Sequence, residues 1–474
     1  MARVTRRRFF EESMIATAVA AATPGLLLAD DAVGEAPSDT IRHAVIGCRI
    51  RGKVHAAEFG QQKGVEVAYV CDPDETLANE LAKAVEEKQG KRPQAVQDLR
   101  KIFEDKSIDT VSVAAPNHWH ALAAIWAMQA GKDVYVEKPV SHNVVEGRRM
   151  IEAVSATGRI CQVGTQRRSI GALQAAAEFI KQGKLGDVTF ARSIIYGNRG
   201  SIGSKGVYDL PKNVDYDLWL GPAPMTKLTR PNLHYDWHWD WQTGGGEMCN
   251  NNIHIIDVCR MLMGLEGLGQ SVLSIGGRMG YEDAGETPNT QIVAHDFGKV
   301  TVVQEVRGLK SDPYSKQFGA GWIIHGTEGF IAEQSLFDPD GKLVQTFEGP
   351  SENHFANFIK AVRSGKREDL HADITEGHQS TALCHVGNIS HRVGKPLPTT
   401  QIEAALAQAA LHEDVARTFA RTVKHLEDNG VDLTKTPLTF GEHLKIDGES
   451  FVGSDAANGL LARTYRKPYE LPVI

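Results

Sequence analysis

Hydrophobic residues in the first third of the chain come in short runs separated by helical patterns. Between residues 41 and 162, short strand-like runs such as 44–46, 110–116 and 133–139 alternate with longer stretches whose hydrophobic positions recur every three or four residues. Strands that alternate with helices predict parallel strands joined by right-handed crossovers. We therefore expect an α/β domain over residues 41–162, built on a doubly wound parallel sheet.

The hydrophobic pattern changes after residue 163. From there the apolar runs follow one another with fewer helices between them, at 188–197, 272–280, 290–297, 299–308 and 321–334. This predicts a mostly antiparallel sheet and a second, α+β domain over residues 163–395. Helical patterns return near the end, and residues 396–474 are expected to form a C-terminal helix and tail that packs on the other domains.

The chain opens with basic residues ahead of a weakly apolar stretch. Three arginines at 6–8 precede residues 13–29, which are largely apolar and interrupted by Pro24. This pattern predicts a twin-arginine export signal and linker over residues 1–36, and hence an exported, periplasmic protein without a membrane span in its mature form. A disordered basic tail and an uncleaved membrane anchor are the alternatives.

The net charge and the cysteine pattern disfavour several classes of binding partner. A net charge of −7 over 474 residues gives no reason to expect nucleic acid or an anionic membrane. The six cysteines have irregular spacing and sit mostly in apolar runs, which is typical of buried free thiols and not of a disulfide framework or a metal site. A small-molecule ligand is the expected partner.

The turn after the first strand has most of a dinucleotide-binding pattern. Gly47 allows a tight turn and Gly52 allows close packing of the helix, so the helix N-terminus, with Ile50 and Arg51, faces a pyrophosphate. Arg49 stands where the middle glycine of G-x-G-x-x-G belongs. It either blocks the site or opens the turn slightly and pairs with phosphate. The second outcome costs about 1 kcal/mol of backbone preference against about 1.5–3 kcal/mol for a charge-assisted hydrogen bond.

The second strand ends in an acidic residue at the expected distance from this turn. Asp72 follows the apolar run 65–71 and lies about twenty residues beyond Gly52. A carboxylate there accepts hydrogen bonds from an adenosine ribose and repels a 2′-phosphate. The prediction is that the cofactor is NAD, with NADP disfavoured.

The predicted strand at 133–139 ends in Glu137-Lys138-Pro139, and its lysine is the first candidate for catalysis. Ligands in open α/β sheets lie outside the carboxyl ends of strands, so Lys138, between Glu137 and Pro139, is expected to project into the cleft. Beside a cationic nicotinamide a partly desolvated lysine has a lowered pKa and can move the proton of a substrate hydroxyl. The alternative is a surface lysine at a strand end.

Residues 234–263 have an unusual mixture of aromatic and polar residues. From about Asn250 the spacing is helical and places Asn250, His254 and Asp257 on one face. His254 is a candidate proton shuttle, with a core histidine as the alternative. A metal site is disfavoured because no fixed ligand spacing is found among the possible ligands His234, Asp236, His238, His254 and Asp257.

Seven pieces in order resemble the Gfo/Idh/MocA oxidoreductases, the glucose–fructose oxidoreductase and inositol dehydrogenase type, over roughly residues 41–395. They are IGCRIRG, VCDPD, AAPNHWHA, VYVEKPV, QVGTQRRS, the NNNIHIID segment and HGTEGFI. The resemblance implies an N-terminal Rossmann domain joined to a domain whose open sheet often serves as an oligomer interface. A homo-oligomer, dimer or tetramer, is therefore expected, with bound NAD(P) and a sugar or polyol substrate.

The resemblance also implies roles for individual residues. Lys138 matches the family's catalytic lysine, His254 its catalytic histidine and Asp72 its ribose-binding acid. Asn250 stands where many members have aspartate, so it can orient His254 and bind a hydroxyl but supplies no charge. The family tolerates variation at Arg49, which favours retention of the cofactor. The remaining expected cofactor-binding residues are Ala115, Pro116, Asn117, His120, Glu137 and Gln166.

Three functions follow, in order of preference. The first is an NAD-dependent oxidoreductase acting on a carbohydrate hydroxyl with a tightly held cofactor, since an exported enzyme has no soluble NAD pool. The second is a glycoside-cleaving or epimerising enzyme of the same fold that oxidises its substrate transiently, and the third is a sugar-binding protein without turnover. Candidate substrate residues are Arg167, Arg168, Tyr196, Tyr235, Trp237, His238 and Asp257.

Overall fold

The computed structural model describes residues 40–474 apart from 316, 317 and 410. The expected export signal at residues 1–36 therefore lies outside the described residues. Within the described part, no helix combines the length and the apolar character needed to cross a membrane.

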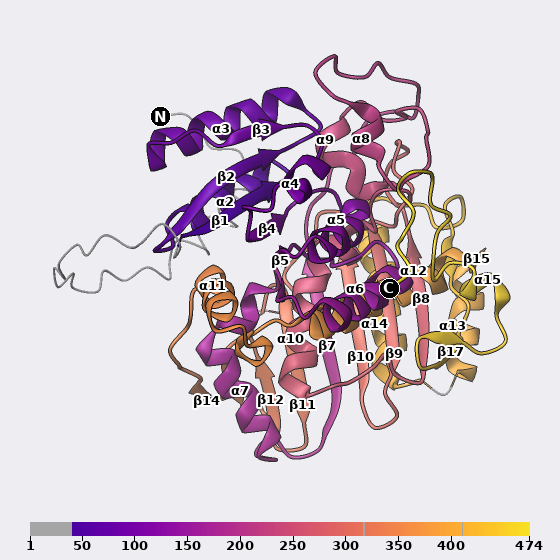
Figure 1. The fold of residues 1–474 in the computed structure, drawn as a ribbon. Helices are drawn as coiled ribbons and strands as arrows, with labels where there is room; N and C mark the ends of the chain where they lie inside the picture. Colours follow the sequence, from indigo (N-terminus) through magenta and orange to yellow (C-terminus); the bar gives the residue numbers. More distant parts are fainter. Residues whose placement is uncertain (1–39, 316–317, 410) are drawn as a thin grey trace, which may run out of the picture.

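The N-terminal domain is a six-stranded parallel sheet with helices on both faces (Figure 1). Its strand order is β3-β2-β1-β4-β5-β6, with β1 Ile41–Ile46, β2 Val65–Cys71, β3 Gln94–Val96, β4 Thr110–Val113, β5 Asp133–Val136 and β6 Cys161–Val163. The helices are α2 Ile50–Gly60, α3 Glu75–Gln89, α4 Arg100–Glu104, α5 Asn117–Gln129 and α6 Val144–Thr157. The predicted doubly wound fold is confirmed. The strand order reverses between β1 and β4, which are neighbours in the sheet. Ligands bind beside the carboxyl ends of the strands at such a point.

The C-terminal domain holds a mixed, mostly antiparallel sheet, as predicted. The main path runs β14-β13-β12-β11-β7-β10-β9-β8-β16-β15, and only β7 and β10 in it pair in parallel. The strands are β7 Val188–Tyr196, β8 Ser271–Gly277, β9 Thr290–Asp296, β10 Thr301–Arg307, β11 Gly321–Gly326, β12 Gly329–Ala332, β13 Ser335–Phe337, β14 Leu343–Thr346, β15 Lys395–Leu397 and β16 Leu438–Phe440. Residues 396–474 thus add strands to this sheet, including β17 Leu444–Asp447 against β8.

The remaining helices are distributed over the two faces of the large sheet and the loops beside it. The inner face packs on α7 Gly171–Lys181, α10 Ile253–Met263 and α12 Ile374–Arg392. The other elements are α8 Tyr216–Leu220, α9 Leu233–Asp236, α11 His354–Ser364, α13 Thr399–Gln408, α14 Glu413–Asp428, α15 Asp455–Asn458 and the short β18 Ser450–Phe451.

The outer face of the large sheet is not open in the way that the resemblance implies. Apolar residues of β7 to β10 pack there against α13 and α14, which bury Ile402, Leu406 and Phe419. Arg192 of β7 also donates to Thr418 at 2.8 Å and pairs with Asp414 at 3.0 Å. The chain's own C-terminal helices therefore cover this part of the face.

Buried histidines should make the fold sensitive to acid. Burial lowers the pKa of His118 to about 3 and those of His295, His354 and His385 to about 4. Since the pKa in the unfolded chain is about 6.5, this contribution to stability is complete above pH 6.5 and is lost as the pH falls toward 4. We expect the melting temperature to fall by several degrees between pH 7 and pH 5 in scanning calorimetry. A constant melting temperature over that interval would contradict the prediction.

Candidate cofactor and substrate site

Two glycines shape the turn between β1 and α2. Gly47 has φ +88°, and a Cβ there would lie 2.6 Å from the carbonyl carbon of Ala114. A Cβ on Gly52 would lie 1.7 Å from the carbonyl oxygen of Gly47. Neither position accepts a side chain without a shift of the backbone, so the turn keeps the close approach that a dinucleotide requires.

Arg49 precedes the first helical residue, Ile50, which is half exposed. The Nη1 atom of Arg49 is buried and has no hydrogen-bond partner among the described residues. Besides burial, the positive charge of Arg49 lowers the pKa of His238, as do the charges of Lys138 and Arg199. A buried guanidinium nitrogen without a partner is costly, and a phosphate oxygen would satisfy it. The side chains at this turn therefore fit the pyrophosphate of a dinucleotide.

Replacing Arg49 by methionine tests this interpretation. We expect NAD affinity, measured by calorimetric titration, to fall about tenfold or more, because a charge-assisted hydrogen bond contributes about 1.5–3 kcal/mol. Arg92→Met is the matched control, since Arg92 is an exposed residue paired with Glu86 at 2.9 Å. Unchanged or tighter binding by the Arg49 variant would mean that Arg49 obstructs the site.

Two carboxylates lie at the end of β2, where an adenosine ribose is expected. The oxygens of Asp72 accept hydrogen bonds from the backbone N–H groups of Cys48 at 2.8 Å and of Asp74 at 2.9 Å, so Asp72 also braces the glycine turn. Burial raises the pKa of Asp72, and those two hydrogen bonds act against the rise. Asp74 caps α3 and pairs with His234 at 2.8 Å. Two acids at this end disfavour a 2′-phosphate.

A segment of the second domain crosses this end of the first (Figure 1). Residues 213–243 contact Asp74 through His234 and Asn213, and the N–H of Asp215 donates to the carbonyl of Pro73 at 2.9 Å. Farther along, the ring of His118 in α5 lies 3.0 Å from the carbonyl oxygen of Trp219. The pattern of apolar residues carries no sign of this crossing, because its contacts join residues more than 100 positions apart.

Glu137 joins two other predicted cofactor residues, Arg51 and Gln166, to His55, which the sequence pattern did not indicate. Its Oε1 accepts hydrogen bonds from Arg51 at 2.9 and 2.5 Å, lies 3.1 Å from Nε2 of His55 and accepts from Gln166 at 3.3 Å. Burial alone would raise the pKa of Glu137, but the charge of Arg51 and the hydrogen bond with His55 hold it well below its ordinary value. This buried network connects α2 to the residue before Lys138.

Lys138 follows β5 at its carboxyl end, as predicted. Its Nζ donates to the backbone carbonyl of Asn250 at 2.6 Å. Burial lowers the pKa of Lys138, and the negative charge of Glu137 acts against this. The ring of His120 lies 2.6 Å from the carbonyl oxygen of Pro139 and 2.7 Å from that of Ala115. His120 therefore links the lysine loop to the end of β4, where Pro116 and Asn117 begin α5.

His254 lies on α10, one residue after its start, and is partly exposed. Burial, followed by the charges of Lys138 and Arg167, lowers the pKa of His254 well below its ordinary value. No hydrogen bond to its ring is found among the described residues. A neutral imidazole with unused nitrogens beside a lysine of lowered pKa can exchange a proton with a hydroxyl placed between them.

The first turn of the helix predicted from about Asn250 differs from a regular α-helix. Residues Met248–Asn252 form a π-helical turn ahead of α10, so the regular α-helix begins only at Ile253. Asn250 turns its amide to Glu247, with Nδ2 3.5 Å from Oε2. Asn250 and His254 make no hydrogen bond to each other in the described structure. The expected orientation of His254 by Asn250 is therefore not found.

Among the predicted substrate residues, Arg168, Asp257 and Tyr196 are engaged elsewhere. Arg168 Nε donates to both carboxylate oxygens of Asp257 at 3.0 and 2.9 Å, and both side chains are buried. Tyr196 donates to Glu305 at 2.8 Å on the outer face of the sheet, because alternate residues of β7 point to opposite faces. None of the three is brought to Lys138.

The other predicted substrate residues lie near the site. Arg167 lies over the ring of Trp322 at 5.1 Å and makes no ion pair among the described residues. Trp237 stacks on His238 with ring centroids 3.6 Å apart, and Nδ1 of His238 lies 2.6 Å from the carbonyl oxygen of Tyr235. Nδ1 is thus the protonated nitrogen, and burial lowers the pKa of His238 to about 3. Three aromatic side chains, Tyr235, Trp237 and His238, thus lie together in this segment.

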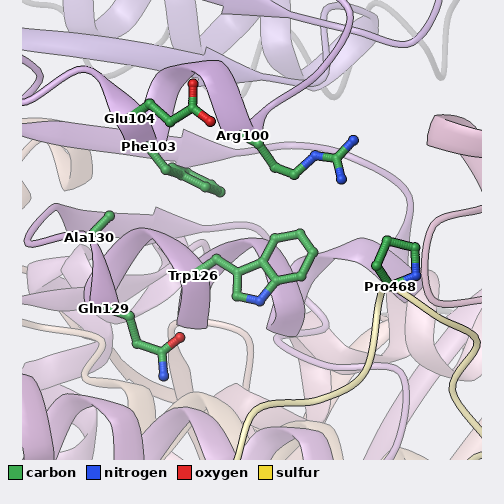
Figure 2. Close-up of a pocket in the computed structure, with 7 residues that line it drawn as sticks. All are labelled: Arg100, Phe103, Glu104, Trp126, Gln129, Ala130 and Pro468. Carbon is green, nitrogen blue, oxygen red and sulfur yellow. The ribbon is translucent and has the colours of Figure 1, made fainter.

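Two further observations concern metal ligands and a second cavity. Within the described part of the chain, no three His, Cys, Asp or Glu side chains gather closely enough to hold a metal ion. A separate hollow lies between α4, α5 and the C-terminal tail, away from the residues above (Figure 2), and is lined by Arg100, Phe103, Glu104, Trp126, Gln129, Ala130 and Pro468.

Comparison with known proteins identifies both domains. Residues 41–165 match the oxidoreductase family, NAD-binding Rossmann fold, and residues 201–422 match its C-terminal alpha/beta domain. The chain is 32% identical over 348 residues to scyllo-inositol 2-dehydrogenase (NAD(+)) of Bacillus subtilis, covering 69% of this chain and 87% of that protein. It is 26% identical over 252 residues to levoglucosan dehydrogenase of Pseudarthrobacter phenanthrenivorans, covering 49% of this chain and 57% of that protein.

A solved structure shares the fold. The WlbA dehydrogenase from Bordetella pertussis, in complex with NADH and UDP-GlcNAcA, superposes with a TM-score of 0.53 at 22% identity, covering 73% of this chain and 94% of that chain. The chain spans 55% and 57% of the lengths of two of the curated relatives that it matches. The match to the inositol dehydrogenase extends over both domains. The chain therefore belongs to the Gfo/Idh/MocA family of oxidoreductases, and its N-terminal domain is an NAD-binding Rossmann domain.

Proposed function

We propose that this protein is an NAD-dependent oxidoreductase that transfers a hydride between the hydroxyl of a sugar, polyol or derivative and a tightly bound cofactor. One observation carries the proposal: Lys138 lies at the carboxyl end of β5 with its Nζ held by the Asn250 carbonyl at 2.6 Å, and its charge acts on the His254 imidazole. This is the end of the sheet where the glycine turn would hold the nicotinamide dinucleotide.

The side chains divide the proton chemistry between them. NAD, when bound, accepts a hydride from a carbinol carbon or returns one to a carbonyl carbon. In its deprotonated form, Lys138 would take the proton of the substrate hydroxyl, and its hydrogen bond to the Asn250 carbonyl fixes its direction. His254 hydrogen-bonds the same or a neighbouring hydroxyl through its free ring nitrogens. Arg51, Glu137 and Gln166 hold the loop that carries the lysine.

Several features support a carbohydrate and a retained cofactor. Inositol and levoglucosan dehydrogenases are among the relatives. The aromatic side chains of Tyr235, Trp237 and His238 could pack against the apolar face of a sugar ring. Arg167, which makes no ion pair among the described residues, could donate to sugar hydroxyls. The segment 213–243 contacts both Asp74 and α5, and we propose that it slows cofactor release. Periplasmic export and a homo-oligomer formed away from α13 and α14 are part of the proposal.

The first experiment is to release and identify nucleotide from the purified full chain. Near-stoichiometric NAD(H), followed by a change in absorbance at 340 nm when inositols or pyranoses are added, is the expected result. NAD(H) without a net change, together with cleavage or epimerisation of the sugar, would favour the closed redox cycle. Absence of nucleotide, and no binding of millimolar NAD, would overturn the proposal in favour of a sugar-binding protein.

A further inference from the structure

A buried carboxylate lies beside the site, although the sequence pattern did not indicate it. Glu247 precedes the π-helical turn and is 4% exposed. Its Oε1 pairs with Nη2 of Arg199 at 3.0 Å and also accepts a hydrogen bond from the amide of Asn251. Its Oε2 faces Nδ2 of Asn250. Three side chains, those of Arg199, Asn251 and Asn250, therefore direct N–H donors at the Glu247 carboxylate, which is the strong acceptor that such donors require.

The contact with Asn250 orients the amide of that residue. Only the NH2 end of an amide can face a carboxylate, so Oδ1 of Asn250 is the atom left without a partner among the described residues. Oδ1 is then available as an acceptor for a substrate hydroxyl. The backbone carbonyl of Asn250 meanwhile receives Lys138 Nζ at 2.6 Å. The π-helical turn Met248–Asn252 thus connects Glu247 both to Lys138 and to Oδ1 of Asn250.

We propose that Glu247 is a positioning residue for Lys138 and Asn250, and that its charge serves in place of the carboxylate that position 250 lacks. This inference rests on the proposed oxidoreductase function. Glu247 does not touch the reacting atoms. It orients the Asn250 amide, anchors Arg199 over the ring of Trp239 at 5.7 Å, and adds negative charge near the lysine.

Several charged groups besides Glu247 also shift the pKa of Lys138. Glu137 on the lysine's own loop and Glu247 raise the pKa of Lys138, and Arg51 of α2 lowers it. Cys249 also raises the pKa of Lys138, and the charge of the lysine in turn lowers the pKa of three histidines on other elements: His120, His238 and His254. Removal of one negative charge should therefore lower the pKa of Lys138 further, because burial and Arg51 already act in that direction.

The test compares Glu247→Gln, Asn250→Asp and the double variant in the full chain. The extent of acetylation of Lys138 by acetic anhydride, followed by mass spectrometry as a function of pH, reports its pKa without any substrate. We expect the midpoint to fall by about one pH unit in Glu247→Gln, and to return in the double variant, which moves the carboxylate to position 250. Glu333→Gln is the matched control, since Glu333 acts on Arg167, whereas the charged and titratable groups that shift the pKa of Lys138 are Glu137, Arg51, Glu247 and Cys249.

A second readout is the pH profile of kcat for inositol oxidation, if the proposed function holds. The rising limb should move to lower pH in Glu247→Gln, with about a tenfold lower plateau, and the double variant should recover both. If Glu247→Gln leaves the acetylation midpoint unmoved and changes only the melting temperature, Glu247 is structural and the inference is overturned. If Glu247→Gln does not fold, Glu247→Asp, with a withdrawn carboxylate, must give a smaller shift in the same direction. A wild-type chain without activity would count against the proposed function alone, because the acetylation readout is independent of it.

Discussion

Replacing Lys138 by methionine should lower kcat for carbohydrate oxidation by about a thousandfold, since a positioned acid or base contributes about 10²–10⁴. Methionine keeps most of the volume of the side chain but cannot take a proton or donate to the Asn250 carbonyl. The carbonyl loses a hydrogen bond of 2.6 Å, which is a local cost. Stopped-flow absorbance at 340 nm measures the rate, and the NAD content of the purified variant should match that of the wild type.

The control for Lys138 is Lys53→Met, which removes the same charge from an exposed position on α2. It should leave kcat within about twofold, since surface substitutions are usually neutral. A Lys138 variant that retains a tenth or more of the wild-type kcat would mean that proton transfer is carried by another group. His254 would then be the first candidate, because its ring is neutral and without a partner.

Substituting alanine for Gly52 should abolish retention of NAD. The added Cβ would lie 1.7 Å from the carbonyl oxygen of Gly47, so the turn has to move and the helix N-terminus leaves the pyrophosphate. Because the new contact is with backbone, no side chain can give way. We expect less than a tenth of the wild-type nucleotide content after acid release, together with a lower melting temperature.

The matched control for Gly52 is Gly60→Ala, at the other end of the same helix. A Cβ at Gly60 would meet only Cγ2 of Val67 at 3.8 Å, which is ordinary contact. Alanine in a helix is favoured over glycine by about 0.5–1 kcal/mol, so this variant should be as stable as the wild type or more so, with full NAD content. Normal NAD content in Gly52→Ala would contradict the assignment of the turn.

The amino-acid sequence alone predicted the layout of both domains and the position of the lysine. Hydrophobic periodicity is a local property, and it correctly placed strands such as β5 and β9 and the helices between the first six strands. Lys138 could be assigned for the same reason. A residue directly after a buried parallel strand must lie at the carboxyl edge of the sheet, whatever the rest of the chain does.

Only the tertiary structure decided which polar side chains meet in the site. The pairing of Arg168 with Asp257 and of Arg199 with Glu247 joins residues 89 and 48 positions apart, and no local pattern reports such distances. The contacts of Asn250 with Glu247 and Lys138 arise in the π-helical turn Met248–Asn252, whereas helical spacing read from the sequence assumes a regular helix. The cover of α13 and α14 over the large sheet likewise depends on burial between distant segments. Periodicity determined the elements, whereas packing and charge pairing across the fold determined the site.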